Sequence, residues 1–173
     1  MTSYTIRPAR QDELGKIQAI EKAAGQLFAA TRYDWIPEDE GMSLPSLAHW
    51  LVHGKIWVAV DEQDEPVGFA VAHEVDGAAY LHELDVHPQH GRRGLGTRLI
   101  DEVTAWAKAC GYPAVTLSTF VGILWNAPYY QKLGFRLLPE AELGPGLREV
   151  RANEIENGFA PDERVCMMRP VTP

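Results

Sequence analysis

The sequence has few cysteines, no long apolar run and no surplus of positive charge. Its 173 residues include only two cysteines, Cys110 and Cys166. Two are too few for a disulfide framework and are typical of reduced thiols in the cytosol. No apolar run approaches the roughly 18 residues that span a membrane. The first ten residues also lack the apolar stretch of a secretory signal. These absences predict a cytoplasmic protein with no membrane partner.

The charge balance argues against a nucleic-acid partner. Sixteen Lys and Arg stand against 24 Asp and Glu, a formal net charge of −8. An acidic surface repels polyanions unless a strong basic patch overrides it. Hydrophobic residues make up 46% of the chain, enough to build a core in a chain of about one domain's length. We therefore expect a single globular domain over residues 1–173.

Hydrophobic periodicity predicts a mixed α/β fold. Strands are expected over residues 4–7, 56–60, 67–75, 78–87, 114–120 and 136–138, and helices over 12–28, 43–53, 94–110 and 127–133. The Asp76-Gly77 turn predicts an antiparallel hairpin, and the strand–helix–strand unit over 78–120 requires one parallel crossover. Residues 139–173 are interpreted as an irregular tail with a candidate last strand over 164–169.

A turn rich in glycine and arginine follows the strand predicted over 78–87. It runs from His87 to Thr97 into an amphipathic helix, whose first backbone N–H groups and positive dipole end favour anions. The sequence has no Gly-x-x-x-x-Gly-Lys-Ser/Thr string, and Gly94-Leu95-Gly96 lacks the third glycine of a dinucleotide fingerprint. The turn therefore predicts a phosphate site of another type, or an ordinary surface loop.

Two motifs together resemble those of the GNAT N-acetyltransferase superfamily. After a strand ending in Val-x-Pro, the family has an acyl-CoA pyrophosphate loop of the pattern Arg/Gln-x-x-Gly-x-Gly/Ala. Here Val86-His87-Pro88 is followed by Gly91 to Gly96, which departs only at the first position, Gly91. Further on, Tyr130 to Phe135 resembles the family's Tyr-x-x-x-Gly-Phe. The resemblance covers about residues 4–138 and implies a mostly antiparallel sheet, splayed to admit acyl-CoA.

The resemblance implies acetyl-CoA as co-substrate and no metal. The pyrophosphate would bind the loop, and the pantetheine amides would pair with strand backbone, with Val86 as the oxyanion donor. Asn126 resembles a cofactor contact of the family and equally fits an N-cap of the helix over 127–133. The implied cofactor-binding residues are Leu84, Asp85, Val86, Gly91, Arg92, Arg93, Gly94, Leu95, Gly96, Thr97 and Asn126.

Acetyl transfer from a thioester to an amine needs a base for the amine and a proton donor for the thiolate. By resemblance, Tyr130 is the donor, with Tyr129 as a rival and packing beside Phe135 as the structural alternative. Period 2 places Glu83 and Asp85 on one face of their strand, and a buried carboxylate beside a second one is a stronger base. We therefore expect Glu83 to be the base. His82 is the alternative, although its face is expected to be buried.

The acceptor is expected to bind near the N-terminal helices and the turn before residue 126. Tyr33, Asp34, Trp35 and Trp125 could receive a cationic amine through carboxylate and cation–π contacts, or could simply pack irregular loops. The predicted reaction is N-acetylation of a primary amine of a small molecule or peptide by direct attack in a ternary complex. The alternatives are a non-catalytic acyl-CoA sensor and a purely structural role, and either form could be a homodimer.

Overall fold

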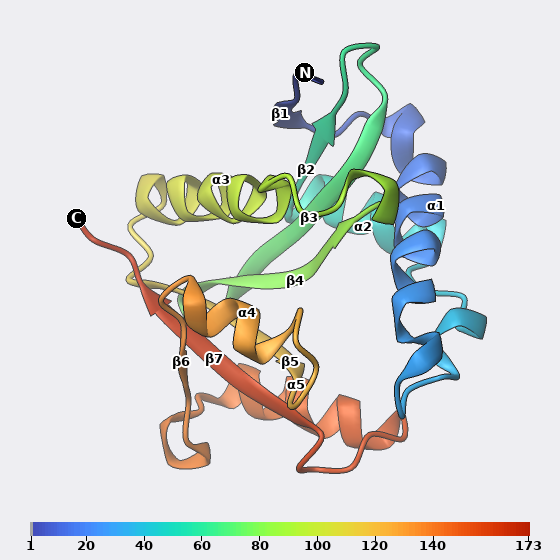
Figure 1. Cartoon of the computed structure of the whole chain (residues 1–173). Coiled ribbons are helices and arrows are strands. Elements are labelled where there is room, and N and C mark those ends of the chain that lie inside the picture. The colour runs from blue at the N-terminus through green and yellow to red at the C-terminus, as the bar shows by residue number, and fades with distance from the viewer. Residues whose placement is uncertain (1) are drawn as a thin grey trace. The chain divides into compact units, whose positions relative to one another are not determined.

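A computed structural model describes residues 2–173, which form a mixed sheet with helices (Figure 1). The strands are hydrogen-bonded in the order β1-β2-β3-β4-β5-β7-β6. Strands β4 and β5 pair in parallel, whereas the pairs β1/β2, β2/β3, β5/β7 and β6/β7 are antiparallel. The predicted mixed sheet with one parallel crossover is therefore confirmed. The strands are β1 (Thr5–Pro8), β2 (Lys55–Val60), β3 (Pro66–Val75), β4 (Ala78–Val86), β5 (Ala114–Phe120), β6 (Arg136–Leu137) and β7 (Arg164–Pro170).

The first four helices lie where periodicity predicts them. They are α1 (Leu14–Gly25), α2 (Leu44–His53), α3 (Leu95–Ala109) and α4 (Ala127–Lys132), followed by α5 (Pro145–Glu156). Short 3₁₀ turns precede and follow α1, so the expected helix over 12–28 is α-helical only in its middle. Ser43 caps α2, because its Oγ accepts from the Ser46 N–H at 3.2 Å. Within residues 2–173, every helix is too short or too polar to cross a bilayer.

The prediction of an irregular tail is wrong. Residues 139–173 contain α5 and β7, and β7 pairs with β5 on one side and with β6 on the other. The candidate last strand over 164–169 is confirmed as β7, but α5 begins with Pro145-Gly146, residues that usually mark turns. Its first turn is held by a residue distant in sequence, which no local pattern reveals.

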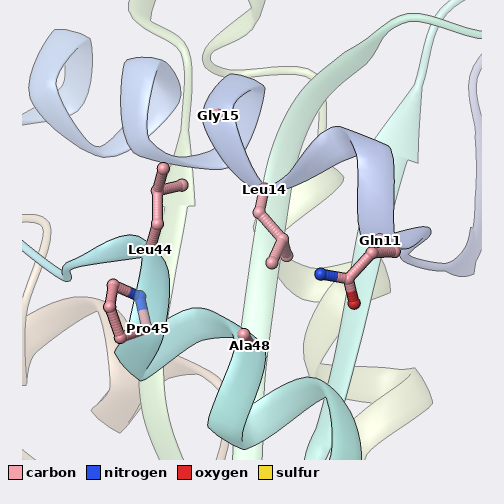
Figure 2. A pocket seen from close by; sticks show the side chains of 6 residues that line it. All are labelled: Gln11, Leu14, Gly15, Leu44, Pro45 and Ala48. Carbon is pink, nitrogen blue, oxygen red and sulfur yellow. The ribbon is translucent and has the colours of Figure 1, made fainter.

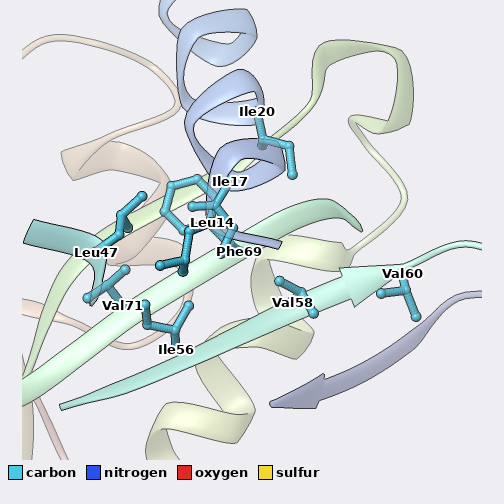
Figure 3. Close-up of a cluster of buried hydrophobic side chains, with 9 residues drawn as sticks. All are labelled: Leu14, Ile17, Ile20, Leu47, Ile56, Val58, Val60, Phe69 and Val71. Carbon is cyan, nitrogen blue, oxygen red and sulfur yellow. The ribbon is translucent and has the colours of Figure 1, made fainter. Parts of the chain in front are cut away.

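The chain divides into two compact units, each with its own core. The N-terminal unit comprises the residues up to His73 and Glu83–Glu102, and the C-terminal unit comprises Glu74–His82 and Val103–Pro173. In the N-terminal unit, buried side chains of α1, α2, β2 and β3 pack together (Figure 3). In the C-terminal unit, Tyr80, Leu143, Leu147 and Cys166 form the centre of a second cluster.

Asp76, in the turn between β3 and β4, caps helix α5. Its carboxylate accepts from the N–H groups of Gly146 at 2.8 Å and Leu147 at 2.9 Å. A Cβ at Gly144 or Gly146 would come within 2.6 Å of another heavy atom, at Asp76 and Val75 respectively. The two glycines around Pro145 therefore leave room for this close approach.

We expect Asp76→Ala to lower the free energy of unfolding by about 1–2 kcal/mol, because the cap is lost. Asp76 also has φ of 53°, a left-handed conformation that Asn tolerates better than Ala. Asp76→Asn should therefore lose less, and Asp101→Ala on the exposed face of α3 should lose little. Urea denaturation measures all three. Equal stability of Asp76→Ala and wild type would contradict the capping role.

Candidate active site

The turn between β4 and α3 ends in an open helix N-terminus. The His87 N–H donates to the Val67 carbonyl at 2.8 Å, which fixes the start of the turn on β3. The Arg98 N–H donates to the Gly94 carbonyl at 3.1 Å, the first hydrogen bond of the helix. Gly94 has φ of 76°, and no atom outside its chain neighbours lies within 4 Å of the place a Cβ would take. The space in front of these N–H groups fits an anionic group.

Tyr4, the residue before β1, contacts this turn. Its hydroxyl lies 2.9 Å from Nδ1 of His90, and Arg98 Nη2 donates to its carbonyl at 2.9 Å. The Arg93 guanidinium carbon lies 5.9 Å from the Tyr4 ring centroid. Burial, followed by the charges of His87 and Arg93, lowers the pKa of His90, so at neutral pH Nδ1 can accept from the tyrosine. Sequence reasoning missed Tyr4, which shares no motif with the turn.

The position at which the sequence departs from the family pattern has little room for a side chain. Gly91 is extended, with φ of −65° and ψ of 162°, and a Cβ there would lie 3.2 Å from the Pro88 carbonyl oxygen. The next residue, Arg92, is exposed and has φ of 58°. A cationic side chain is therefore carried one residue later than in the family pattern, on a backbone that L-residues adopt at a cost of about 1–2 kcal/mol.

Glu83 and Asp85 lie in the half of β4 that belongs to the N-terminal unit, directly before this turn. Both are partly buried. The pKa of Asp85 is raised well above its usual range, first by burial, then by the charges of Glu83 and Glu21 and by a hydrogen bond with Glu83. The expectation that the two carboxyls share an environment is confirmed. His82, in contrast, is exposed: its face of β4 is covered at Tyr80 but not two residues further on.

Glu21 on α1 is a third acidic group in this environment. Its carboxylate accepts from the Met42 N–H, with distances of 3.2 and 3.0 Å to the two oxygens, and Gln18 donates to the Met42 carbonyl at 2.9 Å. Burial, with a smaller effect of Asp39, raises the pKa of Glu21. Position 41 has no room for a side chain, because a Cβ on Gly41 would lie 2.7 Å from the Glu21 carboxylate. Sequence reasoning missed Glu21, which appears only as a polar position of a helix.

We expect Asp85→Asn to stabilise the unliganded protein at high pH. Because the folded pKa is raised, the folded state holds the proton to a higher pH than the unfolded chain, and ionisation opposes folding as the pH rises. The gain in unfolding free energy should be small near pH 4, about the unfolded pKa, and should grow as the pH is raised towards 8. Urea denaturation across this range tests it, with Asp101→Asn as the exposed control. A pH-independent difference would contradict the burial of this charge.

In the C-terminal unit, Tyr130 is buried on α4, with 7% of its surface exposed. Its ring contacts Tyr129 and Phe135, with centroids 5.4 and 5.6 Å away. Asn126 precedes α4 but its side chain makes no capping hydrogen bond. Its Oδ1 is buried, with no hydrogen-bond partner among residues 2–173. Asn126 is therefore the N-cap residue of α4 by position, because its carbonyl accepts from the Tyr130 N–H at 3.0 Å, but its side chain does not cap the helix. The orphaned side-chain oxygen fits a contact to a bound molecule.

The predicted acceptor residues differ in exposure. Tyr33 is buried, and the Arg32 guanidinium carbon lies 5.0 Å from its ring centroid. Asp34 and Trp35 are exposed in the same loop of the N-terminal unit, and Trp125 is exposed in the C-terminal unit. Asp34, Trp35 and Trp125 are thus exposed to solvent, whereas Tyr33 is buried and has a cation over its ring.

An apolar groove of about 390 Å³ lies between α1 and α2, and none of these residues lines it (Figure 2). The side chains of Leu14 and Leu44 line it from the two helices, and Gln11 is its one polar lining residue. The groove contains no acid, base or nucleophile. It therefore carries no chemistry for acyl transfer.

A family model described as "Acetyltransferase (GNAT) family" matches residues 21–135. The chain is also similar to the peptidyl-lysine N-acetyltransferase YjaB of Salmonella typhimurium, with 25% identity over 139 residues, which are 80% of this chain and 87% of that protein.

Two solved structures share the fold. One is a GNAT-family acetyltransferase from Staphylococcus aureus, with a TM-score of 0.73 and 16% identity over 98% of this chain and 100% of that one. The other is the PaiA N-acetyltransferase of Thermoplasma acidophilum in complex with coenzyme A. Its TM-score is 0.70, with 16% identity over 97% of this chain and 99% of that one.

Proposed function

Because the chain belongs to the acetyltransferase (GNAT) family, it is an acyl-CoA-dependent acyltransferase, and we propose that it acetylates a primary amine of a small molecule or peptide. One observation carries the proposal: strand β4 bears the carboxyls of Glu83 and Asp85, which interact with each other, and runs directly into a turn suited to phosphate. The candidate base thus lies in the N-terminal unit, on the part of β4 that leads directly into the candidate cofactor loop.

The residues present fit acetyl-CoA. The cofactor supplies the acetyl group as a thioester. Backbone N–H groups from Gly94 to Thr97 would hold its pyrophosphate, while Leu95 buries its side chain in the core and contributes main chain only. Arg92 and Arg93 would add positive charge, and the orphaned Oδ1 of Asn126 would accept a hydrogen bond from the cofactor. The backbone of Leu84, Asp85 and Val86 would pair with the pantetheine amides.

In the proposed reaction, the amine nitrogen forms a bond to the acetyl carbon and the carbon–sulfur bond breaks. Glu83 accepts the proton that the amine loses, and the Tyr130 hydroxyl donates a proton to the departing sulfur. The Val86 N–H donates to the carbonyl oxygen, where negative charge develops. Direct attack is supported by Cys166, because burial raises the pKa of its thiol to about 11 and a protonated thiol is a poor nucleophile.

A cationic acceptor suits the acidic surroundings of β4. Glu21, Glu83 and Asp85 lie in one unit, and the similar Salmonella protein is named for peptidyl-lysine acetylation. We therefore propose a lysine-like amine, in a peptide or a small molecule, as the acceptor class. A non-catalytic acyl-CoA sensor is the second candidate, and homodimer formation and a cytoplasmic location remain predictions.

The experiment combines binding with turnover. Acetyl-CoA should raise the unfolding temperature of the protein, since a ligand at 100 times its Kd adds about 2.7 kcal/mol. Release of free thiol is then measured with lysine peptides, polyamines, amino acids and aminoglycosides as acceptors. Binding without turnover on any acceptor supports the sensor, and absence of binding contradicts both functions.

We expect Arg92→Gly to stabilise the unliganded protein but weaken acetyl-CoA binding. Glycine adopts the left-handed backbone conformation of residue 92 without the steric cost that arginine has. The replacement should therefore raise the unfolding free energy by about 1 kcal/mol and the Tm by roughly 2–4 °C. Losing one charge-assisted contact should weaken acetyl-CoA binding roughly tenfold. Arg92→Lys, which keeps both charge and strain, is the control. A more stable Arg92→Gly protein with unchanged affinity would show that Arg92 does not contact the cofactor.

A further inference from the structure

Two histidines one turn apart in the C-terminal half of α2 form a pair that the proposed transfer chemistry does not use. His49 and His53 are exposed. Their ring centroids lie 4.6 Å apart, and the rings are tilted by 37°. Residues four apart on a helix lie on one face. Both imidazoles therefore reach solvent from the same side of α2, outside the phosphate turn and the carboxyl pair.

The spacing of these rings fits two ligands of one metal ion. Imidazole nitrogens bind zinc at about 2.0–2.1 Å, which places the ring centroids of two adjacent ligands roughly 4.5–5.2 Å apart. The 4.6 Å between His49 and His53 falls in this range. Histidines at i and i+4 on one helix face are also the ligand pair of helical zinc motifs. We propose that His49 and His53 bind one Zn²⁺, Ni²⁺ or Cu²⁺ ion, with water in its remaining positions.

The local charge favours a cation at this pair. Helix α2 contains no Asp, Glu, Lys or Arg, and His53 is its last residue, at the end where the helix dipole attracts positive charge. The exposed Lys55 that begins β2 opposes the ion, whereas the net charge of the chain, −8, favours it. His73 on β3 stacks on Trp50 at 4.0 Å, so its ring is engaged with that indole.

The site has two protein ligands. Among residues 2–173, no group of three or more His, Cys, Asp and Glu side chains is arranged to hold a metal ion. The bound ion is therefore exchangeable, and it leaves when the imidazoles are protonated. Its effect is to cross-link one turn of α2, the helix that follows the loop carrying Asp34 and Trp35.

The test titrates the untagged full chain with ZnCl₂ and NiCl₂ in a calorimeter, and with CuCl₂ while tryptophan fluorescence is recorded. The Trp50 ring centroid lies 4.6 Å from that of His49, so Cu²⁺ at the pair should quench Trp50. Trp50→Phe should remove most of the saturable quenching. We expect one ion per chain, bound roughly tenfold or more weakly by His49→Gln and by His53→Gln, since each variant keeps a single ligand.

His73→Gln is the matched control and should bind the ions as wild type does. Circular dichroism shows that each variant keeps its helices. Unchanged affinity in both His49→Gln and His53→Gln, an equal loss in His73→Gln, or the absence of saturable binding would overturn the site. None of these measurements depends on acetyl transfer, so the result is independent of the proposed function.

Discussion

Replacing Tyr130 with phenylalanine is expected to lower kcat by about 10²–10⁴-fold, the contribution typical of a positioned proton donor. The departing sulfur would then leave as an unprotonated thiolate. Phenylalanine keeps the ring that packs against Phe135 at 5.6 Å, so the fold and acetyl-CoA binding should be unchanged. Steady-state kinetics with an acceptor identified by the thiol-release measurement, together with a thermal-shift measurement of cofactor binding, separates the two effects.

Tyr129→Phe is the matched control, because the two neighbouring tyrosines lie on the same helix. Tyr129 is only partly buried, whereas Tyr130 is buried. We expect Tyr129→Phe to keep kcat within a few-fold of wild type. A large loss in Tyr129→Phe, with little change in Tyr130→Phe, would show that Tyr129 and not Tyr130 is the proton donor. Full activity in both variants would remove the tyrosine from the mechanism.

Local patterns in the sequence were sufficient to predict most elements of the fold. Ser43 as a cap, Asp76-Gly77 as a hairpin turn and the turn leading into α3 are all encoded within a few residues. Helix α5 could not be predicted, because its first N–H groups are satisfied by Asp76, 70 and 71 residues earlier in the chain. A long-range cap leaves no signature beside the helix that it stabilises.

The candidate site shows the same division between local and distant information. The period of β4 correctly placed Glu83 and Asp85 together, since alternation is a property of one strand. It could not show that Glu21 adds its charge to them, nor that the cover over Tyr80 ends before His82. Both depend on what packs against the strand. The side-chain oxygen of Asn126 likewise proved to make no capping bond, which only the folded geometry reveals.

Replacing Glu83 with glutamine is expected to lower kcat/KM by about 10²–10⁴-fold at neutral pH, because the base for the amine is lost. A lysine-like amine has a pKa of about 10.4, so the neutral amine becomes more abundant as the pH rises. The activity of Glu83→Gln should therefore increase steeply from neutral to alkaline pH and approach that of wild type. A pH profile of kcat/KM for both proteins measures this convergence.

Two further variants decide between the open alternatives for the base. His82→Gln removes the exposed imidazole and leaves both carboxyls, so it should retain most activity if Glu83 is the base. Asp85→Asn keeps Glu83 but replaces the titratable carboxyl that is hydrogen-bonded to it, and should alter the pH profile more than the maximal rate. A large loss in His82→Gln with near-normal Glu83→Gln would make histidine the base. Normal activity in both variants would assign proton removal to water, and Glu83 would then have no direct part in the reaction.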